Sequence, residues 1–253
     1  MSGHSKWAKI KRTKGALDQK RGKIFSKIGR EIQLAAKAGG GSPETNIRLR
    51  NILLKAKEVS MPSDTIKRAI NKGIGTEASD LLEEMVYEGY GPGGVAILVE
   101  VVTDNRNRTA SDIRSIFTKN NGNMGESGSV GFLFDKKGLI LIKKDLIRED
   151  ALMELILNSG AEDLKTDKQD IYEIISSVEN FSNVRSALEK KEILLESAEI
   201  TMIPKTLIAL DEKKTEAVLK LVDALDDHDD VQNVFSNIEI SEALMDKFEK
   251  KEI

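Results

Sequence analysis

The spacing of apolar residues changes near Gly75, and this change constrains the fold more than any other feature of the sequence. Before Gly75, apolar side chains recur every three or four residues, as Ile24, Ile28 and Ile32 do, which is typical of an amphipathic helix. After it they recur about every second residue, for instance in residues 95–102, which is typical of a strand with one buried face. We therefore expect a helical N-terminal part followed by α+β structure.

Three helices are predicted before Gly75. The first starts at Gly22 and is stopped by the glycines at 39–41, the second follows Pro43, and the third runs over residues 63–72. Together they predict a small helical bundle. Residues 1–21 show almost no apolar periodicity, so we expect them to be extended or only loosely helical until bound.

The remaining chain alternates strands and helices. We predict strands at 85–88, 95–102 and 130–134 and a helix at 107–120. A second group follows in the order β-α-β-β-α-β, which is the ferredoxin-like order, with strands at 139–142, 163–166, 171–177 and 197–203 and helices at 150–158 and 184–190. The helix at 215–225 and the strand at 231–238 have no partners of their own, so we pair them with the unit at 80–134.

The expected fold class is therefore α+β and multidomain. An N-terminal helical bundle precedes two α+β domains with antiparallel sheets, one of which is ferredoxin-like and inserted in the other. The predicted domains are residues 1–78 for the basic arm and bundle, residues 79–135 with 205–253 for the discontinuous domain, and residues 136–204 for the insert.

The charge of the chain is split between these parts. Residues 1–75 hold 18 Lys and Arg against 5 Asp and Glu, a net of +13, whereas the rest of the chain carries a net of −16. Ten basic side chains lie within the first 30 residues beside one carboxylate, Asp18. Such a field favours a polyphosphate partner, because each neutralised phosphate releases condensed counterions. Nucleic acid is the leading partner, and the acidic α+β domains could dock a protein partner.

Composition excludes several classes of protein. The chain has no Cys, so it can hold neither a disulfide framework nor a thiolate zinc site, and this suits a reducing cytoplasm. No apolar run reaches the roughly 18 to 20 residues that span a bilayer, so we expect no membrane partner and a cytoplasmic location. The two histidines, His4 and His228, lack a recognisable nucleophile or carboxylate partner. We expect no enzyme activity, no catalytic residue, no cofactor and no small-molecule substrate.

Two motifs have a structural and a functional interpretation. The turn at residues 89–94, Gly-Tyr-Gly-Pro-Gly-Gly, indicates a β-hairpin and not a nucleotide loop, because no Lys-Ser/Thr and no helix follow it; Tyr90 is a possible exposed contact. The segment Asp-Asn-Arg-Asn-Arg-Thr at 104–109 precedes a helix, where Asn105 or Asn107 could act as the cap. Alternatively, Arg106 and Arg108 could clamp a phosphate there.

The acidic run at residues 226–230, Asp-Asp-His-Asp-Asp, joins the last predicted helix to the last predicted strand. Its residue types could bind a divalent ion, but it lacks the ligand ladder and the glycine of a calcium loop. We interpret it as a solvated turn and predict no metal site.

Several motifs together resemble the YebC/PmpR family. They are Ser-Gly-His-Ser-Lys-Trp-Ala at 2–8, Lys-Arg-Gly-Lys-Ile-Phe-Ser-Lys at 20–27, Gly-Tyr-Gly-Pro-Gly-Gly at 89–94, Asp-Asn-Arg-Asn-Arg-Thr at 104–109, Gly-Ala-Glu-Asp at 160–163 and Met-Ile-Pro at 202–204. The resemblance implies a three-domain fold with one helical and two α+β domains. It also implies a transcriptional regulator, or a translational activator that acts at the ribosome.

Combining these signals, we predict a non-enzymatic regulator of gene expression that binds DNA through its N-terminal domain. The alternative is a ribosome-associated translation factor that binds ribosomal RNA, because a basic arm is equally suited to RNA folds and no helix-turn-helix signature is clear. Trp7 could stack on a base or anchor the arm to the bundle. The candidate nucleic-acid-binding residues are Lys6, Trp7, Lys9, Lys11, Arg12, Lys14, Lys20, Arg21, Lys23, Lys27, Arg30, Arg48, Arg50, Arg106 and Arg108.

Overall fold

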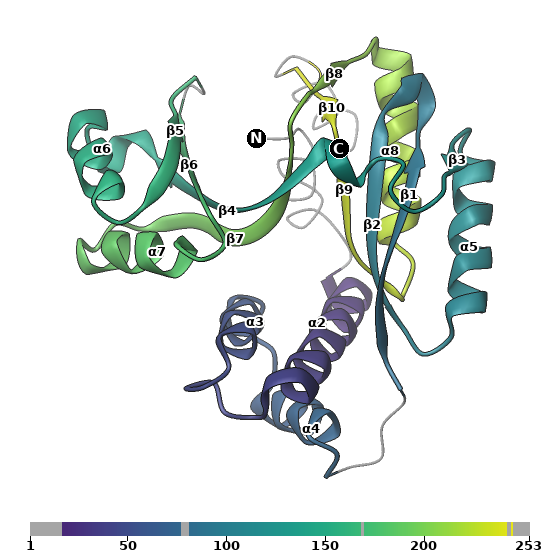
Figure 1. Cartoon of the computed structure of the whole chain (residues 1–253), viewed down its shortest axis with the longest axis horizontal. Helices are drawn as coiled ribbons and strands as arrows, with labels where there is room; N and C mark the ends of the chain where they lie inside the picture. The colour runs from purple at the N-terminus through teal and green to yellow at the C-terminus, as the bar shows by residue number, and fades with distance from the viewer. Residues whose placement is uncertain (1–16, 77–80, 168–169, 242–243, 245–253) are drawn as a thin grey trace. The chain divides into compact units, whose positions relative to one another are not determined.

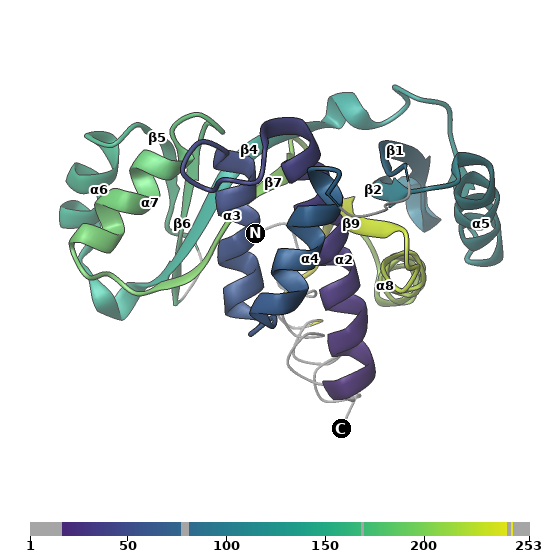
Figure 2. The ribbon, with the colours of Figure 1, turned by 90° about the horizontal axis from the view of Figure 1, so that it is seen from below.

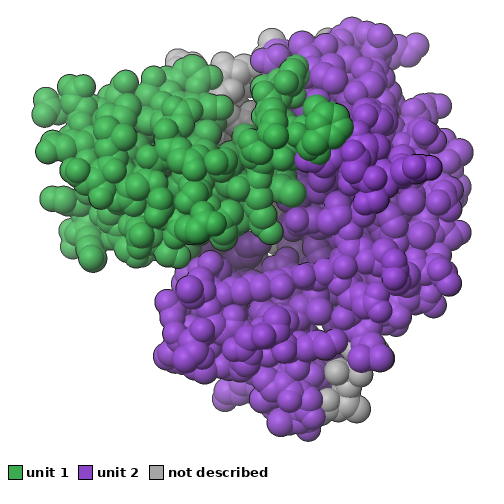
Figure 3. Space-filling model, viewed as in Figure 1, with its two compact units in different colours: residues 1–2, 132–207 green, residues 3–131, 208–253 purple. Residues whose placement is uncertain are grey.

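The computed structural model describes residues 17–76, 81–167, 170–241 and 244 (Figure 1). Within these residues the fold is α+β, with seven α-helices and two four-stranded antiparallel sheets, as predicted. The described residues divide into two compact units (Figure 3): those within 132–207 form one, and those within 17–131 and 208–244 form the other. The ferredoxin-like part is thus inserted in the other α+β part, while the three-domain boundaries stay a prediction.

The helical bundle consists of α2 (Leu17–Gly39), α3 (Ile47–Glu58) and α4 (Ser63–Gly73). Their apolar faces meet in one core, which contains Ile28, Ile32, Ala35, Leu49, Ile52, Ala56, Met61 and Ala69. Helix α2 already includes residues 17–21, which we expected to be extended or loosely helical. None of the described helices is long and apolar enough to cross a membrane.

Two residues explain how the bundle closes. Asn46 caps α3 by accepting a hydrogen bond from the backbone N–H of Leu49, and its amide nitrogen donates to the carbonyl oxygens of Ala35 and Gly40, both at 2.8 Å. One buried side chain therefore joins the end of α2 to the start of α3. Gly73 lets α4 approach α2, since a Cβ there would lie 2.4 Å from the carbonyl oxygen of Gln33.

The first sheet has the strand order β3-β1-β2-β9. Its strands are β1 (Glu83–Tyr90), β2 (Ala96–Thr103), β3 (Asn123–Met124) and β9 (Val231–Ser236). Helices α5 (Arg106–Lys119) and α8 (Glu212–Asp226) pack on one face, where Ile113 and Phe117 of α5 and Leu221 of α8 share a core with the odd-numbered residues of β2. The predicted pairing of the last helix and strand with the earlier unit is confirmed.

A tight turn joins β1 to β2, as the sequence predicted. Residues Pro92–Gly94 form a 3-10 turn in which Gly93 and Gly94 have φ values of +75° and +79°. Glycine is the residue that adopts this left-handed region without steric cost. The turn sets the register in which Tyr90 lies opposite Ala96.

The opposite face of this sheet receives the helical bundle (Figure 2). Because side chains alternate along a strand, Val102 points away from the core that contains Val101. Val102 packs with Leu34 of α2 and Leu82 in a small buried cluster. This cluster brings α2 beside β2 and beside the connection from α8 to β9.

The inserted unit has the predicted β-α-β-β-α-β order. Its sheet has the strand order β5-β6-β4-β7, which is the ferredoxin-like arrangement. The elements are β4 (Phe134–Lys143), α6 (Glu149–Leu157), β5 (Ala161–Lys165), β6 (Ile171–Ser176), α7 (Phe181–Lys190) and β7 (Leu195–Pro204). Ile140, Ile142 and Ile174 of the sheet pack against Leu152, Ile156, Val184 and Leu188 of the two helices.

Two short strands of the other unit, β8 (Ile208–Ala209) and β10 (Ile238–Glu239), pair in parallel.

The strand predicted at residues 130–134 is wrong. The segment contains the 3-10 turn Gly131–Leu133, and β4 begins only at Phe134. The buried Glu88 carboxylate accepts hydrogen bonds from the backbone N–H groups of Gly128, Val130 and Gly131 at 2.6–2.7 Å, so these groups cannot join a ladder. Burial acts to raise the pKa of Glu88, but the three N–H groups outweigh it and hold that pKa below its ordinary value.

Candidate nucleic-acid interface

Three cations of α2 form a row along one helix face, which we call the α2 basic row: Lys23, Lys27 and Arg30. Their spacing of four and three residues places them on neighbouring turns. They face residues 226–230, which we call the acidic segment and which connect α8 to β9. Lys23 Nζ donates to the carbonyl oxygen of Asp227 at 3.0 Å. The sequence predicts a solvated turn for this segment, and its contact with α2 is not apparent from the sequence.

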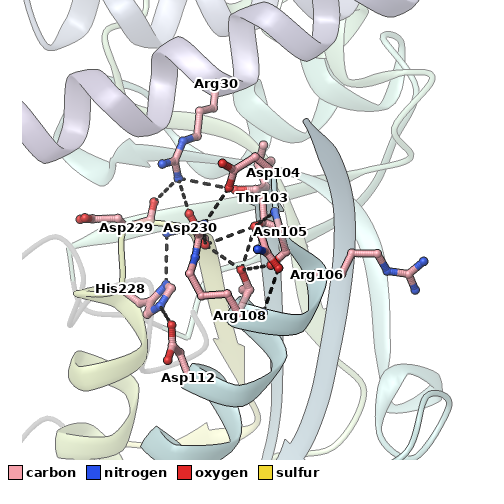
Figure 4. A network of polar contacts seen from close by, with 12 residues as sticks. Arg30, Thr103, Asp104, Asn105, Arg106, Arg108, Asp112, His228, Asp229 and Asp230 are labelled. Atoms are coloured by element: carbon pink, nitrogen blue, oxygen red, sulfur yellow. Dashed lines mark hydrogen bonds and ion pairs between the residues drawn. The ribbon is translucent and has the colours of Figure 1, made fainter. Parts of the chain in front are cut away.

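The contacts continue along the row. Lys27 Nζ donates to the carbonyl oxygen of Asp226 at 2.7 Å and to its carboxylate at 3.0 Å. Arg30 Nη1 donates to the carbonyl oxygen of Asp229 at 2.6 Å and to the Asp230 carboxylate at 3.0 Å (Figure 4). The whole α2 basic row is therefore partnered within the chain.

The end of α8 explains why this contact forms. The last turn of α8 carries Asp223 and Asp226 and has no basic residue, although a helix C-terminus has a partial negative charge that favours cations. Helix α2 supplies the missing cations from another part of the chain. Exposed ion pairs contribute only about 0–1 kcal/mol each. The Lys27–Asp226 pair is partly exposed, with side chains 16% and 46% exposed, and Lys23 contacts only a backbone oxygen.

Asp230 is the buried end of the acidic segment. Its side chain is 5% exposed, and besides Arg30 it accepts hydrogen bonds from Thr109 at 2.7 Å, Arg108 at 3.1 Å and Thr103 at 3.3 Å. Burial acts to raise the pKa of Asp230. The hydrogen bonds from Thr109 and Arg108 and the charges of Arg30 and Arg108 outweigh it, so this pKa lies below its ordinary value. Asp230 thus remains ionised and fixes two arginines.

The start of α5 sets the position of Arg108. Asn105 is the N-cap of the helix, and its side chain accepts a hydrogen bond from the backbone N–H of Arg108 at 3.1 Å. Of the two candidate caps, Asn105 is therefore the one used. The Arg108 guanidinium donates to Asp104 at 2.7 Å as well as to Asp230, and both contacts raise its pKa.

Arg106 and Arg108 do not converge on one point. Figure 4 shows the Arg106 side chain pointing away from the network around Asp230. Arg106 is 67% exposed, and its nearest carboxylate is that of Glu83, at 3.9 Å from Nε. A phosphate clamp made by both arginines stays a prediction that this geometry does not favour.

The other candidates within the described residues lie elsewhere on the bundle. Arg48 pairs with Glu84, and Arg50 donates to the carbonyl oxygens of Pro43 and Glu44 at 2.9 and 2.7 Å. Arg21 lies over the ring of Phe25, 5.9 Å from its centroid. Lys20 belongs to α2, but the structure does not describe its side chain. The arm candidates Lys6, Trp7, Lys9, Lys11, Arg12 and Lys14 lie outside the described residues.

Other cations of the bundle are exposed. Lys57 at the end of α3 and Lys67 and Lys72 on α4 have exposed side chains, and none forms an ion pair with another residue of the described ranges. Arg68, also exposed, donates to the carbonyl oxygen of Asp64 at 3.4 Å. These four cations are available to an external anion.

A cleft of about 440 Å³ opens beside the α2 basic row. It is lined by Lys23, Arg30, Arg108, Asp227, His228, Asp229 and Asp230. The Nε2 atom of His228 lies 3.4 Å from the Asp112 carboxylate, and its Nδ1 accepts a hydrogen bond from the backbone N–H of Asp230 at 3.2 Å. Among the described residues no three His, Asp or Glu side chains are arranged to hold a metal ion.

Comparison with known proteins identifies the family. A model of the TACO1/YebC protein N-terminal domain matches residues 5–76, and a model of the TACO1/YebC second and third domain matches residues 82–238. The chain belongs to the TACO1/YebC family. The resemblance seen in the sequence motifs is confirmed.

Relatives in the TACO1/YebC family are named as regulators. A protein of Geobacter sp. strain M21 is 56% identical over 98% of this chain and 99% of its own length, and one of Syntrophobacter fumaroxidans is 53% identical over 98% and 99%. Both are called "probable transcriptional regulatory protein". The crystal structure of a conserved hypothetical protein from Aquifex aeolicus matches with a TM-score of 0.79 at 43% identity, and covers 90% of this chain and 93% of that one.

Sequence reasoning on this TACO1/YebC chain missed Asp230, Thr103 and Thr109 as partners of the arginines. A signal for Thr109 existed, because it lies four residues before Ile113 and eight before Phe117, on the buried side of α5. Asp230 directly precedes the buried strand β9, which separates it from the solvated aspartates before it. Neither sequence pattern indicates that Thr109 contacts Asp230, or that Asp230 contacts Arg30 and Arg108.

Proposed function

We propose that this protein is a nucleic-acid-binding regulator of gene expression that acts without catalysing a reaction, and that its helical N-terminal part binds DNA in transcriptional regulation. The observation that carries the proposal is the group of exposed cations on α3 and α4, Lys57, Lys67, Arg68 and Lys72. They add to the basic arm in a segment with a net charge of +13. The regulatory names of the relatives support the same function.

The type of contact follows from the residue types. Three of the four exposed cations are lysines, which bind phosphate as point charges and lack the planar fork of arginine. Binding to the backbone of the nucleic acid is therefore the mode that these side chains support. Since DNA and RNA share that backbone, the second candidate is a ribosome-associated translation factor that binds ribosomal RNA.

The proposal extends to location and partners. The absence of Cys in the sequence suits a reducing compartment, and we place the protein in the cytoplasm with its nucleic-acid target. The net charge of −16 after residue 75 would repel nucleic acid from the α+β parts. We propose that these acidic parts dock a protein partner.

The test is the salt dependence of binding. If about eight phosphates are contacted on duplex DNA, the logarithm of the binding constant should fall against the logarithm of salt concentration with a slope of about −7. The experiment titrates a labelled DNA duplex and a labelled ribosomal RNA fragment with the full chain between about 50 and 200 mM salt. A salt-independent affinity for both would reject the proposal. Crosslinking in cells, with sequencing of bound DNA and RNA, decides between the candidates, because a dominance of ribosomal RNA rejects the transcriptional role.

A further inference from the structure

We infer that the α2 basic row is a binding site for a nucleic-acid backbone, and that the acidic segment occupies this site as an internal substitute for phosphate. The inference rests on the proposed function and goes beyond it, because it states that two parts of one chain compete with an external polyanion for the same cations. The observation behind it is the set of contacts by which Lys23, Lys27 and Arg30 bind residues 226–230.

The acceptors in the acidic segment have the chemistry of a phosphate backbone. Within the acidic segment, the acceptors are the carbonyl oxygens of Asp226, Asp227 and Asp229 and the carboxylates of Asp226 and Asp230. Arg30 also donates to the carbonyl oxygen of Val102 on β2, at 3.5 Å. Phosphate oxygens could take over the hydrogen bonds of Lys23 and Lys27, since an ionised phosphate oxygen accepts from an ammonium group at least as strongly as a carbonyl oxygen does. The row would then exchange one anionic partner for another without being left unpaired.

The two ends of the contact differ in how readily they can exchange. At the outer end, Lys23 and Asp227 are exposed; further in, the Asp226 side chain is 46% exposed and its partner Lys27 is 16% exposed. At the inner end, Asp230 is 5% exposed and is held by Thr109 and Arg108 in addition to Arg30. The outer end is therefore the part that an external polyanion can displace, while the inner end keeps α2 attached.

The cleft beside the row gives an external phosphate a route to it. Lys23, Arg30 and Arg108 contribute to its lining together with the acidic segment, so a phosphate in the cleft would meet cations on one side and aspartates on the other. The aspartates would repel it as long as they remain charged. Their charge, and not a lack of space, is what limits access.

The test uses four full-length proteins and a charge-matched control. The first variant, D226N/D227N/D229N, removes three charges but keeps the side-chain and backbone oxygens as acceptors, and it leaves Asp230 in place. The second is K23Q/K27Q, and the third combines all five changes; the fourth protein is the unchanged chain. The control, E126Q/E212Q/E239Q, changes the net charge equally at other positions, and Glu212 lies about 21 Å along α8 from Asp226. Circular dichroism and thermal unfolding establish that each variant is folded.

Each protein is titrated against a labelled DNA duplex and a labelled RNA hairpin at several salt concentrations. For one or both probes, D226N/D227N/D229N is expected to bind about tenfold more tightly than the unchanged chain, with a salt slope steeper by about 2 because two cations are released. The control is expected to change the affinity less than about threefold, since none of its three residues contacts the α2 basic row in the structure and Glu212 lies beyond the Debye length of about 10 Å. The probe that shows the gain identifies the type of nucleic acid.

The decisive result is non-additivity. K23Q/K27Q should weaken binding little in the unchanged chain, where the row is occupied, and should abolish the whole gain in the D226N/D227N/D229N background. Equal effects of K23Q/K27Q in both backgrounds, or an equal gain in the control, would overturn the inference while leaving the proposed function intact. If neither the unchanged chain nor D226N/D227N/D229N binds either probe, both the inference and the proposed function are rejected.

Discussion

Helices α2 and α4 both carry several cations, but they use them differently. On α2, Lys23, Lys27 and Arg30 are all bonded to oxygens of the chain's own acidic segment. On α4, Lys67 and Lys72 are exposed and form no ion pair with the residues that the structure describes. The net charge of a segment therefore overstates the charge that a partner can meet. A basic sequence can meet a partner directly only where the fold leaves it unpaired; elsewhere the partner must first displace the internal acceptors.

The largest effect should come from removing the buried anchor of α2. Asp230→Ala leaves Arg30 and Arg108 without their shared carboxylate, and breaking a buried ion pair from one side costs roughly 3–5 kcal/mol. We expect about 3 kcal/mol, because the Arg108 side chain is 49% exposed and water solvates it in part. Urea unfolding measures the change. Asp229→Ala is the matched control, because Arg30 contacts only the backbone oxygen of Asp229, and a loss of similar size there would contradict the comparison.

Acid should weaken the same anchor. The pKa of Asp230 and the pKa of Glu88 are both lower in the folded state than their ordinary values, so the stabilisation they give is present above about pH 4 and is lost as the pH falls through the folded values. Urea unfolding at a series of pH values should show the free energy of unfolding decreasing below about pH 4. Asp230→Asn should be less stable at neutral pH and should show a smaller decrease. A decrease of unchanged size would exclude Asp230 as a contributor.

The cations of α4 should affect binding and not stability. Lys67→Gln with Lys72→Gln is expected to reduce the salt slope of nucleic-acid binding by about 2 and to weaken binding several-fold, because two phosphate contacts are lost. The free energy of unfolding should stay within about 0.5 kcal/mol of the unchanged chain. Arg48→Gln with Arg50→Gln removes equal charge from side chains that already have partners, so it should weaken binding less. An equal loss would mean that internal pairing does not remove these cations from the surface.

The smallest expected effect concerns the cap that positions Arg108. Asn105→Ala should cost about 1 kcal/mol, the usual value of a lost N-cap, whereas Asn107→Ala should be nearly neutral. Thermal unfolding compares the two variants. If the larger loss appeared at Asn107, the cap assignment and the fixed position of Arg108 beside Asp230 would both be wrong.

The sequence predicted most elements because apolar burial has a local signature. The periodicity of Ile28 and Ile32 indicated α2, and the alternation in β2 indicated a sheet, since each pattern depends only on neighbours along the chain. The last helix and strand could be assigned to the earlier α+β unit because two isolated elements cannot form a hydrophobic core of their own. These parts of the fold follow from sequence spacing alone.

The site could not be predicted in the same way. Lys27 and Asp226 are 199 positions apart, and nothing in the local pattern of either residue specifies the other. The misassigned strand at residues 130–134 has the same origin, because Glu88 binds the backbone of that segment from about 40 positions away. Long-range polar contacts of this kind depend on the completed fold.

The insertion of residues 132–207 has a consequence for the order in which the protein can be completed. Strand β2 lies between β1 and β9 in the sheet, so one edge of β2 has no ladder partner until β9, at Val231–Ser236, has been synthesised. At about 5–20 residues per second, a ribosome needs on the order of ten seconds to reach β9 after finishing β2. During that interval the inserted unit is complete in sequence and can fold first. The acidic segment directly precedes β9, so on the nascent chain Lys23 and Lys27 are without these acidic partners until synthesis has reached the last strand of the sheet.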